Sequence, residues 1–563
     1  MQRRIPLILA IAVLFAPGGI VMAQPPAVVY ETSIPGYELA HAHDVVVDGN
    51  GNTFLIGSYY ADGAHLDILV VKLDAQGNEV WNYTIEASDH DYATGLALDS
   101  AGDVWVTGFT DSQDFPVLDA MDDTLTGFRD VFLLKLAASD GSLLYSTFIG
   151  GDYVDSAGGI AIDAADRIYL TGVAGSTDFP TTPGAYQGEP SFPLYSYQDA
   201  FIMKLSAGGN TILYSTYFGG TQDDWGDRIG LDGDGNIIIA GRTTADDFPL
   251  ANEIDATRRS IFVSKLSADG ATLLFSTFIG GSESEQLGGM RTDAGGDVYL
   301  AGATDSPDFP TTSGAFQETF VGAVNGCDVP FGGTFNCEDF FATRLSTTGG
   351  GVIWSTFIGG TTVDVARDIA FDGSGNAYVA GHTVSADFPL SDTEFSADIV
   401  VCKLSDNGTH LDYTLSIPSG SANRGNGVFV DDNGAVYFTG TVGVPASVYA
   451  SKLQAPQSTT TTDAGTTPAG LSLGRNVPNP FNPSTRITFT IPNKAGSGSV
   501  KLSVFDVRGR LVARLVDGPK GSGSYTVTWN GRNRYGAEVG TGVYFYRLQW
   551  NSQTISRRMV LLK

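Results

Sequence analysis

Short apolar runs separated by turn-forming residues recur along residues 28–453 of the 563-residue chain. In one stretch they are Ile160–Asp163, Ile168–Thr171, Ala200–Leu205 and Ile212–Phe218, with Gly, Asp, Asn and Ser between them. Each run is too short for a helix and is rich in Ile, Val, Tyr and Phe, which is typical of β-strands. The pattern therefore predicts units of four short strands.

This four-strand unit is repeated seven times, and two fixed positions define the repeat. An aspartate stands nine residues before a glycine in every copy: Asp48/Gly57, Asp99/Gly108, Asp163/Gly172, Asp232/Gly241, Asp293/Gly302, Asp372/Gly381 and Asp431/Gly440. A basic residue before leucine marks each copy again, at Lys72, Lys135, Lys204, Lys265, Arg344, Lys403 and Lys452. Repeated four-strand units are typical of a β-propeller, in which four-stranded blades pack radially.

The two ends of the array predict how the ring closes. The last copy stops after Ser451-Lys452-Leu453 without a fourth strand, and residues 28–36 match the fourth-strand residues 143–151 of another copy. An N-terminal strand in the last blade would remove two open sheet edges. We predict an all-β fold in which residues 24–453 form a closed seven-bladed β-propeller with four-stranded blades.

The repeat also resembles a known family. Its core, AxDxxGNxYxxGxTxSxDFP followed by DxFxxKLxxxGxxLxYSTxxGG, resembles the bacterial seven-bladed β-propeller (SBBP) repeats over about residues 28–453. The resemblance implies the propeller architecture and no single activity.

A second module is expected after a linker. Residues 454–474 are rich in Thr, Ala, Pro and Gly, which is typical of a flexible linker. Residues 475–563 alternate apolar runs with Gly-rich turns, and strands are expected at 487–491, 500–507, 511–516, 525–529, 543–550 and 554–562. Several short strands in so few residues predict a small Ig-like β-sandwich.

This module begins with a proline-rich motif that cannot be helical, because prolines and the residues before them favour extended backbone. The motif is Pro478, Asn479, Pro480, Phe481, Asn482 and Pro483. Together with VFDVRGRLV, WNGRNRYGAEVGTGVYFYRL and SRRMVLLK, it resembles the type A C-terminal sorting domain of type IX secretion and the Ig-like domain of the flagellar hook-capping protein. The sorting resemblance implies export across the outer membrane, with the secretion machinery as a partner. The alternative is a stabilising sandwich without a transport role.

The first 23 residues predict a secretory signal peptide. Arg3 and Arg4 precede an apolar run from Ile5 to Phe15, and small residues end at Ala23. No other stretch is apolar enough to span a membrane, so no transmembrane segment is expected after signal cleavage. We expect the protein outside the cell or on the outer-membrane surface.

Three cysteines fit an exported protein. Cys327 and Cys337 lie in one long insertion and are expected to form a local disulfide in an oxidising compartment. The alternative is a metal site, for which no histidine lies nearby in the sequence. Cys402 lies within a predicted strand and is expected to be a small buried hydrophobic residue.

The formal charge of −30 is unevenly distributed. Residues 454–563 hold 14 Lys and Arg against 4 Asp and Glu, whereas the remainder holds 18 against 58, a balance of −40. An acidic propeller is not expected to bind nucleic acid.

The connections after the second and fourth strands are long and variable, and such loops on a rigid scaffold commonly carry binding. Eight residues before the anchor aspartate, five copies place a carboxylate on this face: Asp91, Asp155, Asp224, Glu285 and Asp364. Carboxylate oxygens suit hard cations, calcium among them. One hypothesis is therefore a cation- or polyol-binding surface.

An architectural role is the alternative for these carboxylates and for a second ring. That ring is an Asp-Phe-Pro sequence at Asp114, Asp178, Asp247, Asp308 and Asp387, and its repetition favours turn capping by the aspartate. Asp232, Asp234 and Asn236 resemble the start of a calcium loop without its downstream acidic ligand, and a Gly- and Asn-rich hairpin turn is the alternative there.

Catalytic signatures are few, since the chain has neither HExxH nor GxSxG. Trp225, Tyr195 and Tyr197 lie on the long loops and are candidates for stacking on sugars. The sequence favours a binding or scaffold protein that recognises an extracellular polysaccharide or a surface protein through the long-loop face. An extracellular glycosidase or lyase on the propeller and a structural envelope protein are the alternatives.

Overall fold

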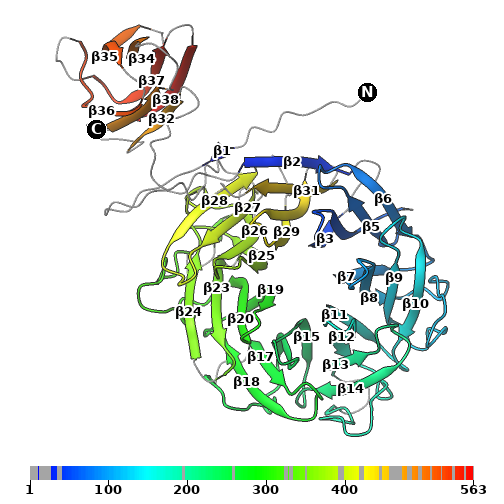
Figure 1. Ribbon diagram of the computed structural model, residues 1–563. Coiled ribbons are helices and arrows are strands. Elements are labelled where there is room, and N and C mark those ends of the chain that lie inside the picture. Colours follow the sequence, from blue (N-terminus) through cyan, green and yellow to red (C-terminus); the bar gives the residue numbers. More distant parts are fainter. Residues whose placement is uncertain are drawn as a thin grey trace. The chain divides into compact units, whose positions relative to one another are not determined.

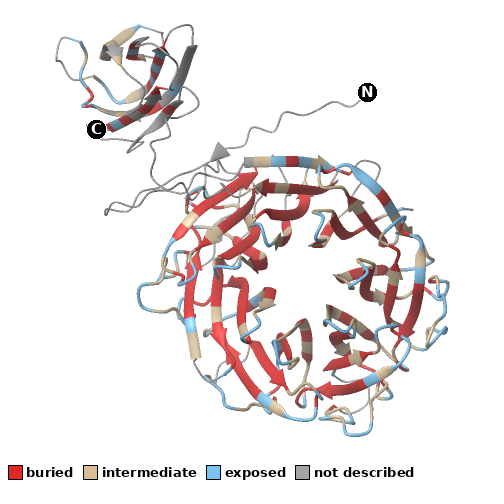
Figure 2. Cartoon of the chain, viewed as in Figure 1, coloured by how far each residue is buried: buried red, intermediate tan, exposed pale blue. Residues whose placement is uncertain are grey.

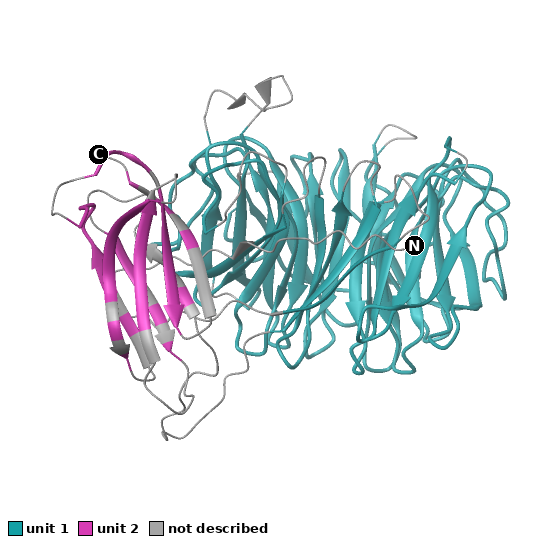
Figure 3. Ribbon diagram, turned by 90° about the horizontal axis from the view of Figure 1, so that it is seen from above, with its two compact units in different colours: residues 1–457 teal, residues 458–563 magenta. Residues whose placement is uncertain are grey.

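The computed structural model describes most of the chain. The described residues are 10–11, 27–34, 41–61, 63–192, 197–255, 260–322, 327–328, 334–335, 337–348, 351–390, 398–417, 424–442, 447–454, 472–477, 485–491, 498–506, 510–520, 523–534, 539–550 and 553–561. They form strands and turns, without a helix that could cross a membrane. The chain divides into two compact units, residues 1–457 and 458–563, which are coloured separately in Figure 3.

The first unit is a ring of seven four-stranded antiparallel sheets, described here from the channel outwards (Figure 1). The inner strands are β3 (His41–Val47), β7 (Asp91–Leu98), β11 (Asp155–Ile162), β15 (Asp224–Leu231), β19 (Glu285–Thr292), β25 (Asp364–Phe371) and β29 (Arg424–Val430). The second strands are β4 (Thr53–Tyr59), β8 (Val104–Thr110), β12 (Ile168–Ala174), β16 (Ile237–Thr243), β20 (Asp297–Thr304), β26 (Ala377–Thr383) and β30 (Val436–Val442).

The outer half of each blade completes the sheet. The third strands are β5 (Asp67–Leu73), β9 (Asp130–Leu136), β13 (Asp199–Leu205), β17 (Ile261–Leu266), β23 (Asp339–Ser346), β27 (Asp398–Leu404) and β31 (Ser447–Gln454). The outer strands are β6 (Glu79–Ile85), β10 (Leu143–Ile149), β14 (Ile212–Phe218), β18 (Leu273–Ile279), β24 (Gly351–Ile358), β28 (Leu411–Ile417) and β2 (Ala27–Ser33). The long insertion before β23 adds the short pair β21 (Cys327–Asp328) and β22 (Thr334–Phe335).

The predicted ring closure is confirmed, because β2 pairs antiparallel with β31 and supplies the outer strand of the last blade. The inner strands are longer than predicted: β11 begins at Asp155, five residues before the expected start. Within the predicted signal peptide, β1 (Ala10–Ile11) pairs with β28, although this segment was expected to lie outside the fold. The rest of the predicted signal peptide lies outside the described residues.

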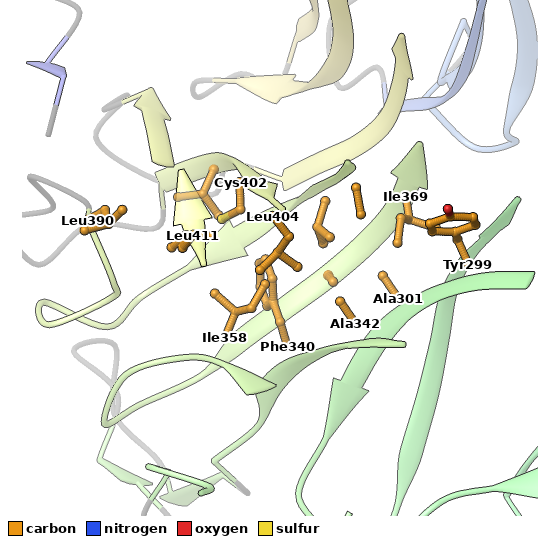
Figure 4. Close-up of a cluster of buried hydrophobic side chains, with 14 of the residues drawn as sticks. Tyr299, Ala301, Phe340, Ala342, Ile358, Ile369, Leu390, Cys402, Leu404 and Leu411 are labelled. Carbon is orange, nitrogen blue, oxygen red and sulfur yellow. The ribbon is translucent and has the colours of Figure 1, made fainter. Parts of the chain in front are cut away.

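Hydrophobic packing occurs between neighbouring blades as well as within them. Each large propeller cluster joins residues of two adjacent sheets, for example β20 and β23 of the fifth blade with β26 and β27 of the sixth (Figure 4). The buried positions accordingly follow the strands around the whole ring (Figure 2). Because a blade buries its faces only against its neighbours, ring closure completes the core of the first and last blades.

Every inner strand carries a β-bulge at the same place, which explains the anchor glycine. One extra residue is inserted between the third and fifth residues of β15, opposite Gly241, and the other six inner strands shift register at the equivalent point. A β-carbon on Gly241 would collide with the backbone carbonyl oxygen of Trp225, and each of the other six anchor glycines faces the equivalent carbonyl. Only glycine allows the bulged strand to approach this closely.

The anchor aspartate and the basic residue are architectural too. In each copy the aspartate accepts hydrogen bonds from the backbone N–H groups two and four residues later, which closes the turn between the inner and second strands. In six copies the basic residue lies over an aromatic ring of the second strand, as Lys135 does over Trp105 at 5.4 Å.

The second unit is a two-sheet sandwich. One sheet has the order β32 (Ser472–Val477), β33 (Thr485–Ile491), β36 (Gly523–Trp529), and the other β35 (Leu511–Lys520), β34 (Gly498–Asp506), β37 (Gly542–Trp550), β38 (Gln553–Leu561). Trp529, Tyr546 and Trp550 are buried in the core between them. Strand β32 starts within the predicted linker, and the proline-rich motif from Pro478 to Pro483 lies outside the described residues.

Replacing the anchor glycine of the fourth blade tests the bulge. We expect Gly241→Ala to lower the free energy of unfolding by about 2 kcal/mol, because the new methyl group must displace the backbone of β15. Gly373→Ala is the matched control, since its β-carbon would meet no atom within 4 Å. Thermal unfolding of both variants measures the difference, and equal midpoints for the two would contradict the packing argument.

Candidate functional site

The predicted carboxylate ring is not a binding surface. Asp91, Asp155, Asp224 and Asp364 have 0% exposed area and Glu285 has 3%. Each begins an inner strand and turns its side chain into the blade. The surface interpretation of these five residues is therefore wrong, because their side chains are buried and the hydrogen bonds they make are to the protein itself.

The third blade illustrates what these carboxylates do. Oδ2 of Asp155 accepts hydrogen bonds from the N–H of Gly151 at 2.9 Å and from the hydroxyl of Ser176 at 2.7 Å. In the second ring, Oδ1 of Asp178 accepts the N–H of Asp152 at 2.8 Å. Gly151 and Asp152 belong to the connection from the second blade to the third, and Ser176 and Asp178 belong to the loop after β12 of the third blade. The two aspartates therefore hold the connection between the blades against this loop.

Aspartates at the start of the third strands form a third buried ring, which the sequence reasoning missed. Asp130, Asp199 and Asp339 have at most 1% exposed area, and each leaves one oxygen without a hydrogen-bond partner within the described residues. The signal was present in the sequence, since an aspartate stands five residues before the basic anchor in five copies: Asp67, Asp130, Asp199, Asp339 and Asp398.

Burial raises the pKa of several of these groups. The pKa of Asp91, Asp155, Asp199, Asp224 and Asp339 rises to about 7, and that of Asp364 to about 8. A nearby carboxylate from another of these rings raises the pKa further, as Asp199 raises that of Asp224. Within the described residues no group of three or more metal-ligating side chains is present.

The remaining sequence candidates have separate positions. Oδ1 of Asp232 accepts the N–H groups of Asp234 and Asn236, and Lys265 pairs with its other oxygen at 2.8 Å, which fits the hairpin-turn alternative. Tyr197 has 39% exposed area, and Tyr195 lies outside the described residues.

The cysteines are placed as follows. Cys337 is disulfide-bonded, and Cys402 is a free buried cysteine that packs in the cluster of Figure 4. The side chain of Cys327 lies outside the described residues, so its pairing with Cys337 stays a prediction.

Residues that differ from blade to blade occupy the channel. The second residue from the start of this register is His41, Tyr92, Ser156, Trp225, Gln286, Val365 and Arg424 in the seven copies, and of these His41, Tyr92 and Arg424 line the channel mouth. The extra residue of the bulge is His43, Thr94, Gly158, Asp227, Gly288, Arg367 and Asn426 in the same order. A bulge redirects a side chain, and most of these extra residues line the channel.

A pocket of about 330 Å³ lies at the channel mouth, on the side where the inner strands begin. It is lined by His41, His43, Ser58, Tyr60, Leu66, Tyr92, Arg228, Leu287, Gly288, Arg367, Arg424 and Asn426. These residues come mainly from six inner strands, which surround the centre of the ring in Figure 1. The described lining has three arginines and no carboxylate, within an acidic propeller.

Two of these arginines make no close ion pair or hydrogen bond among the described residues. Neither Arg367 nor Arg424 forms an ion pair or a hydrogen bond there, whereas Arg228 donates to the carbonyl oxygens of Asp227 and Gly288. Burial lowers the pKa of Arg367, and the charge of Arg424 lowers it further. The attraction of Glu338 acts on the pKa of Arg367 in the opposite direction, so the positive charge of the mouth is compensated in part.

The channel is more balanced below this pocket. Arg291 pairs with Asp368 at 3.0 Å and lies 4.0 Å from Asp44, beside a smaller cavity of about 50 Å³. The unpaired positive charge thus belongs to the mouth and not to the whole channel.

Aromatic rings stand at the same level of the mouth. Tyr92 stacks on Phe109 with ring centroids 5.5 Å apart and an interplanar angle of 11°. Trp225 is half-buried, and the guanidinium of Arg242 lies 5.1 Å from its ring while pairing with Asp227. Trp225 does not line either cavity, and its role as a ligand contact stays a prediction.

Comparison with protein families supports the two modules. The beta-propeller repeat (SBBP) model matches residues 213–249 and 353–389, and the FlgD Ig-like domain model matches residues 475–553. The chain carries SBBP propeller repeats followed by a FlgD Ig-like domain. No curated protein matches the sequence.

Solved structures of low sequence identity share parts of the arrangement. A fungal alcohol oxidase of the AA5 family, in complex with copper, is 13% identical, covers 96% of this chain and 100% of its own, and has a TM-score of 0.42. An acylaminoacyl peptidase of Pyrococcus horikoshii is 10% identical, with coverages of 82% and 60% and a TM-score of 0.38. At this similarity neither protein indicates a function for this chain.

The raised pKa values predict that stability falls as the pH rises from 6.5 to 8. The folded chain retains protons on carboxyls such as Asp224 and Asp364 that the unfolded chain has already lost, so stability is lost as the pH passes their folded pKa values of about 7 and 8. The lowered pKa values of His43 and His382 act mainly below 6.5. Thermal midpoints measured across this range should fall with rising pH, and a rising midpoint would contradict the assignment.

Asp224→Asn isolates one of these groups. The amide can still accept the N–H of Gly220 through its oxygen, and the charge next to Asp199 is removed. We expect a higher midpoint than in the parent chain at pH 8 and a flatter pH dependence. The last blade already has Asn423 at the equivalent position.

Proposed function

We propose that this protein is a secreted or cell-surface binding protein whose propeller takes up an acidic saccharide at the channel mouth. The observation that supports this proposal is the pair Arg367 and Arg424, which line the mouth pocket without a close ion pair or a hydrogen bond among the described residues. Arg367 is half-buried and Arg424 is exposed, so both can present a guanidinium group to an anion in the pocket.

The expected anion is a carboxylate or a similar planar oxyanion. Guanidinium groups bind carboxylates through two parallel hydrogen bonds, and they are more weakly hydrated than ammonium groups. Residues 1–453, which include the propeller, have a net charge of −40. This charge repels anions from other parts of the propeller, so the mouth is the favoured place for an anion to bind.

The aromatic surroundings favour a saccharide as the carrier of this charge. Tyr60 and Tyr92 line the same pocket as Arg424, and aromatic side chains combine apolar area with orientation. The pocket volume of about 330 Å³ is near the lower end of small-molecule sites, which suits a short saccharide segment.

The C-terminal module is proposed to direct export. The FlgD Ig-like match at residues 475–553, together with the resemblance of the PNPFNP motif to type A sorting domains, supports a role in type IX secretion. The secretion machinery is then the partner of this module, and the extracellular saccharide is the partner of the propeller.

Removal of the two free guanidinium groups tests the binding site. We expect the double variant Arg367→Gln and Arg424→Gln to weaken binding of a galacturonate oligomer at least tenfold, because each charged hydrogen bond is worth roughly 1.5–3 kcal/mol. Isothermal titration calorimetry measures the affinity. The methyl-esterified oligomer, which has no charge, should bind weakly to the parent chain.

Arg167→Gln is the matched control for the loss of positive charge. Arg167 is exposed, pairs with Asp163 and lies in the turn between β11 and β12, at the opposite end of the inner strands. If this variant loses as much affinity as the double variant, binding reflects overall charge and the mouth is not the site.

Truncation tests the export proposal. A chain ending at Gln457 retains the propeller unit and lacks the sandwich, so we expect it to accumulate inside the outer membrane of a type IX-competent host. Cell fractionation with immunodetection measures its location. Arrival of the truncated chain at the surface in parental amounts would remove the sorting role from this module.

A further inference from the structure

The mouth pocket is enclosed by strands on almost every side. Its lining comes from the inner strand of every blade except the third, together with β4 and the loop that follows it. By strand register, the lining residues lie at the second to fifth positions of the inner strands, from Arg424 near the rim to Arg228 deeper in the channel. Three steps along a strand span about 10 Å. The pocket is therefore short, and it extends along the channel axis.

Arg291 crosses the channel below this pocket. It belongs to β19 of the fifth blade, pairs with Asp368 of the sixth blade at 3.0 Å and lies 4.0 Å from Asp44 of the first blade. Because the fifth and first blades are not neighbours in the ring, the approach of Arg291 to Asp44 spans the channel (Figure 1). Asp368 also accepts the N–H of Val428 from the seventh blade at 2.9 Å, so the bridge is held by several blades.

The space around this bridge is too small for a sugar ring. The cavity there has a volume of about 50 Å³, which is enough for a few water molecules. It shares His43, Arg228 and Asn426 with the mouth pocket, and its other residues include Arg291 further along β19, so it lies directly below the pocket. A saccharide that enters at the mouth therefore cannot pass through the channel, and it must leave by the same opening.

The wall of the pocket offers a polar group that suits a free sugar hydroxyl. Nε2 of His43 lies 2.7 Å from Oγ of Ser58, and Nδ1 of His43 lies 3.0 Å from Oη of Tyr92. In either tautomer of His43, the Tyr92 hydroxyl keeps the capacity for a further hydrogen bond. A terminal sugar residue has one more free hydroxyl than an interior residue, so it can use this group as well as the arginines.

We propose that the mouth pocket is closed at its inner end and binds the terminal uronate residue of an acidic saccharide. This inference rests on the proposed binding of an acidic saccharide at Arg367 and Arg424. The two arginines bind the carboxylate of the terminal residue, and Tyr92 contacts one of its free hydroxyls. An interior residue does not fit, because the saccharide would have to continue on both sides of it within a pocket that has one opening.

The rest of the saccharide then lies outside the channel. Residues 1–453 have a net charge of −40, which repels the carboxylates of further uronate residues. Additional residues therefore add little affinity. The expected ligand is the end of a chain or a short oligomer, and a long polymer offers few such ends for its mass.

A length series of galacturonate oligomers tests this inference with the full mature chain. Isothermal titration calorimetry gives the affinities of the dimer, the tetramer and the octamer, each expressed per saccharide chain. Because every oligomer has the same two ends, we expect the octamer to exceed the dimer by no more than about twofold. A larger rise, in step with the number of residues, would overturn the end-binding proposal and leave the binding proposal intact. Failure of all three oligomers to bind would overturn both.

Blocked tetramers give a second readout. One carries a methyl group on the terminal O4, and the other has its reducing end opened by chemical reduction. We expect at least one of them to bind at least tenfold more weakly than the unmodified tetramer, because the altered end no longer fits the pocket. Unchanged affinity for both would overturn the end-binding proposal even if the length series is flat.

Tyr92→Phe tests the hydroxyl contact. It retains the ring that stacks on Phe109 and removes only the hydroxyl, so the dimer and the octamer should lose the same factor of about threefold to tenfold in affinity. Arg167→Gln, which lies outside the mouth, should keep the parental affinity. Equal thermal midpoints confirm that both variants fold. A Tyr92→Phe chain with unchanged affinity would overturn the contact between Tyr92 and the terminal residue.

Discussion

The propeller depends on the close approach of two strands at one point of every blade. The bulged inner strand lies so near the second strand that only the anchor glycine fits opposite it, and this holds in all seven copies. The bulge inserts one residue that has no partner on the second strand, and most of these residues line the channel. The bulge opposite the anchor glycine therefore shapes every blade in the same way. It also creates one position per blade, the extra residue of the bulge, whose amino acid the packing of the blade does not determine.

Those free positions are where the blades differ. The buried carboxylates, the turn aspartates and the anchor glycines repeat because they hold connections and strands together. The bulge residue is instead histidine, threonine, glycine, aspartate, arginine or asparagine according to the blade. His43 and Arg367 are both of this kind. The mouth pocket is consequently asymmetric, although its framework is nearly sevenfold. A ligand site of this kind can form while the rest of each blade keeps the repeated sequence pattern, because only the residues at the channel differ.

The sequence predicted the fold well because the fold is made of repeated local patterns. Strand periodicity, the Asp–Gly spacing and the missing fourth strand were sufficient for the closed ring, and β2 beside β31 confirms it. The site was predicted less well. Repetition drew attention to Asp155 and its equivalents, yet their side chains are buried and hold the blade connections. The informative signal was variation at one register, visible as His41, Tyr92, Trp225 and Arg424, but the clustering of Arg367 with Arg424 follows only from the closed ring.

A crystal structure of the propeller with a galacturonate oligomer tests the central claim most directly. The account predicts the oligomer at the channel mouth, with a uronate carboxylate bound by the guanidinium groups of Arg367 and Arg424 and a sugar ring near Tyr92. An oligomer bound only on the outer strands, with the mouth empty, would contradict the claim that the channel positions form the site.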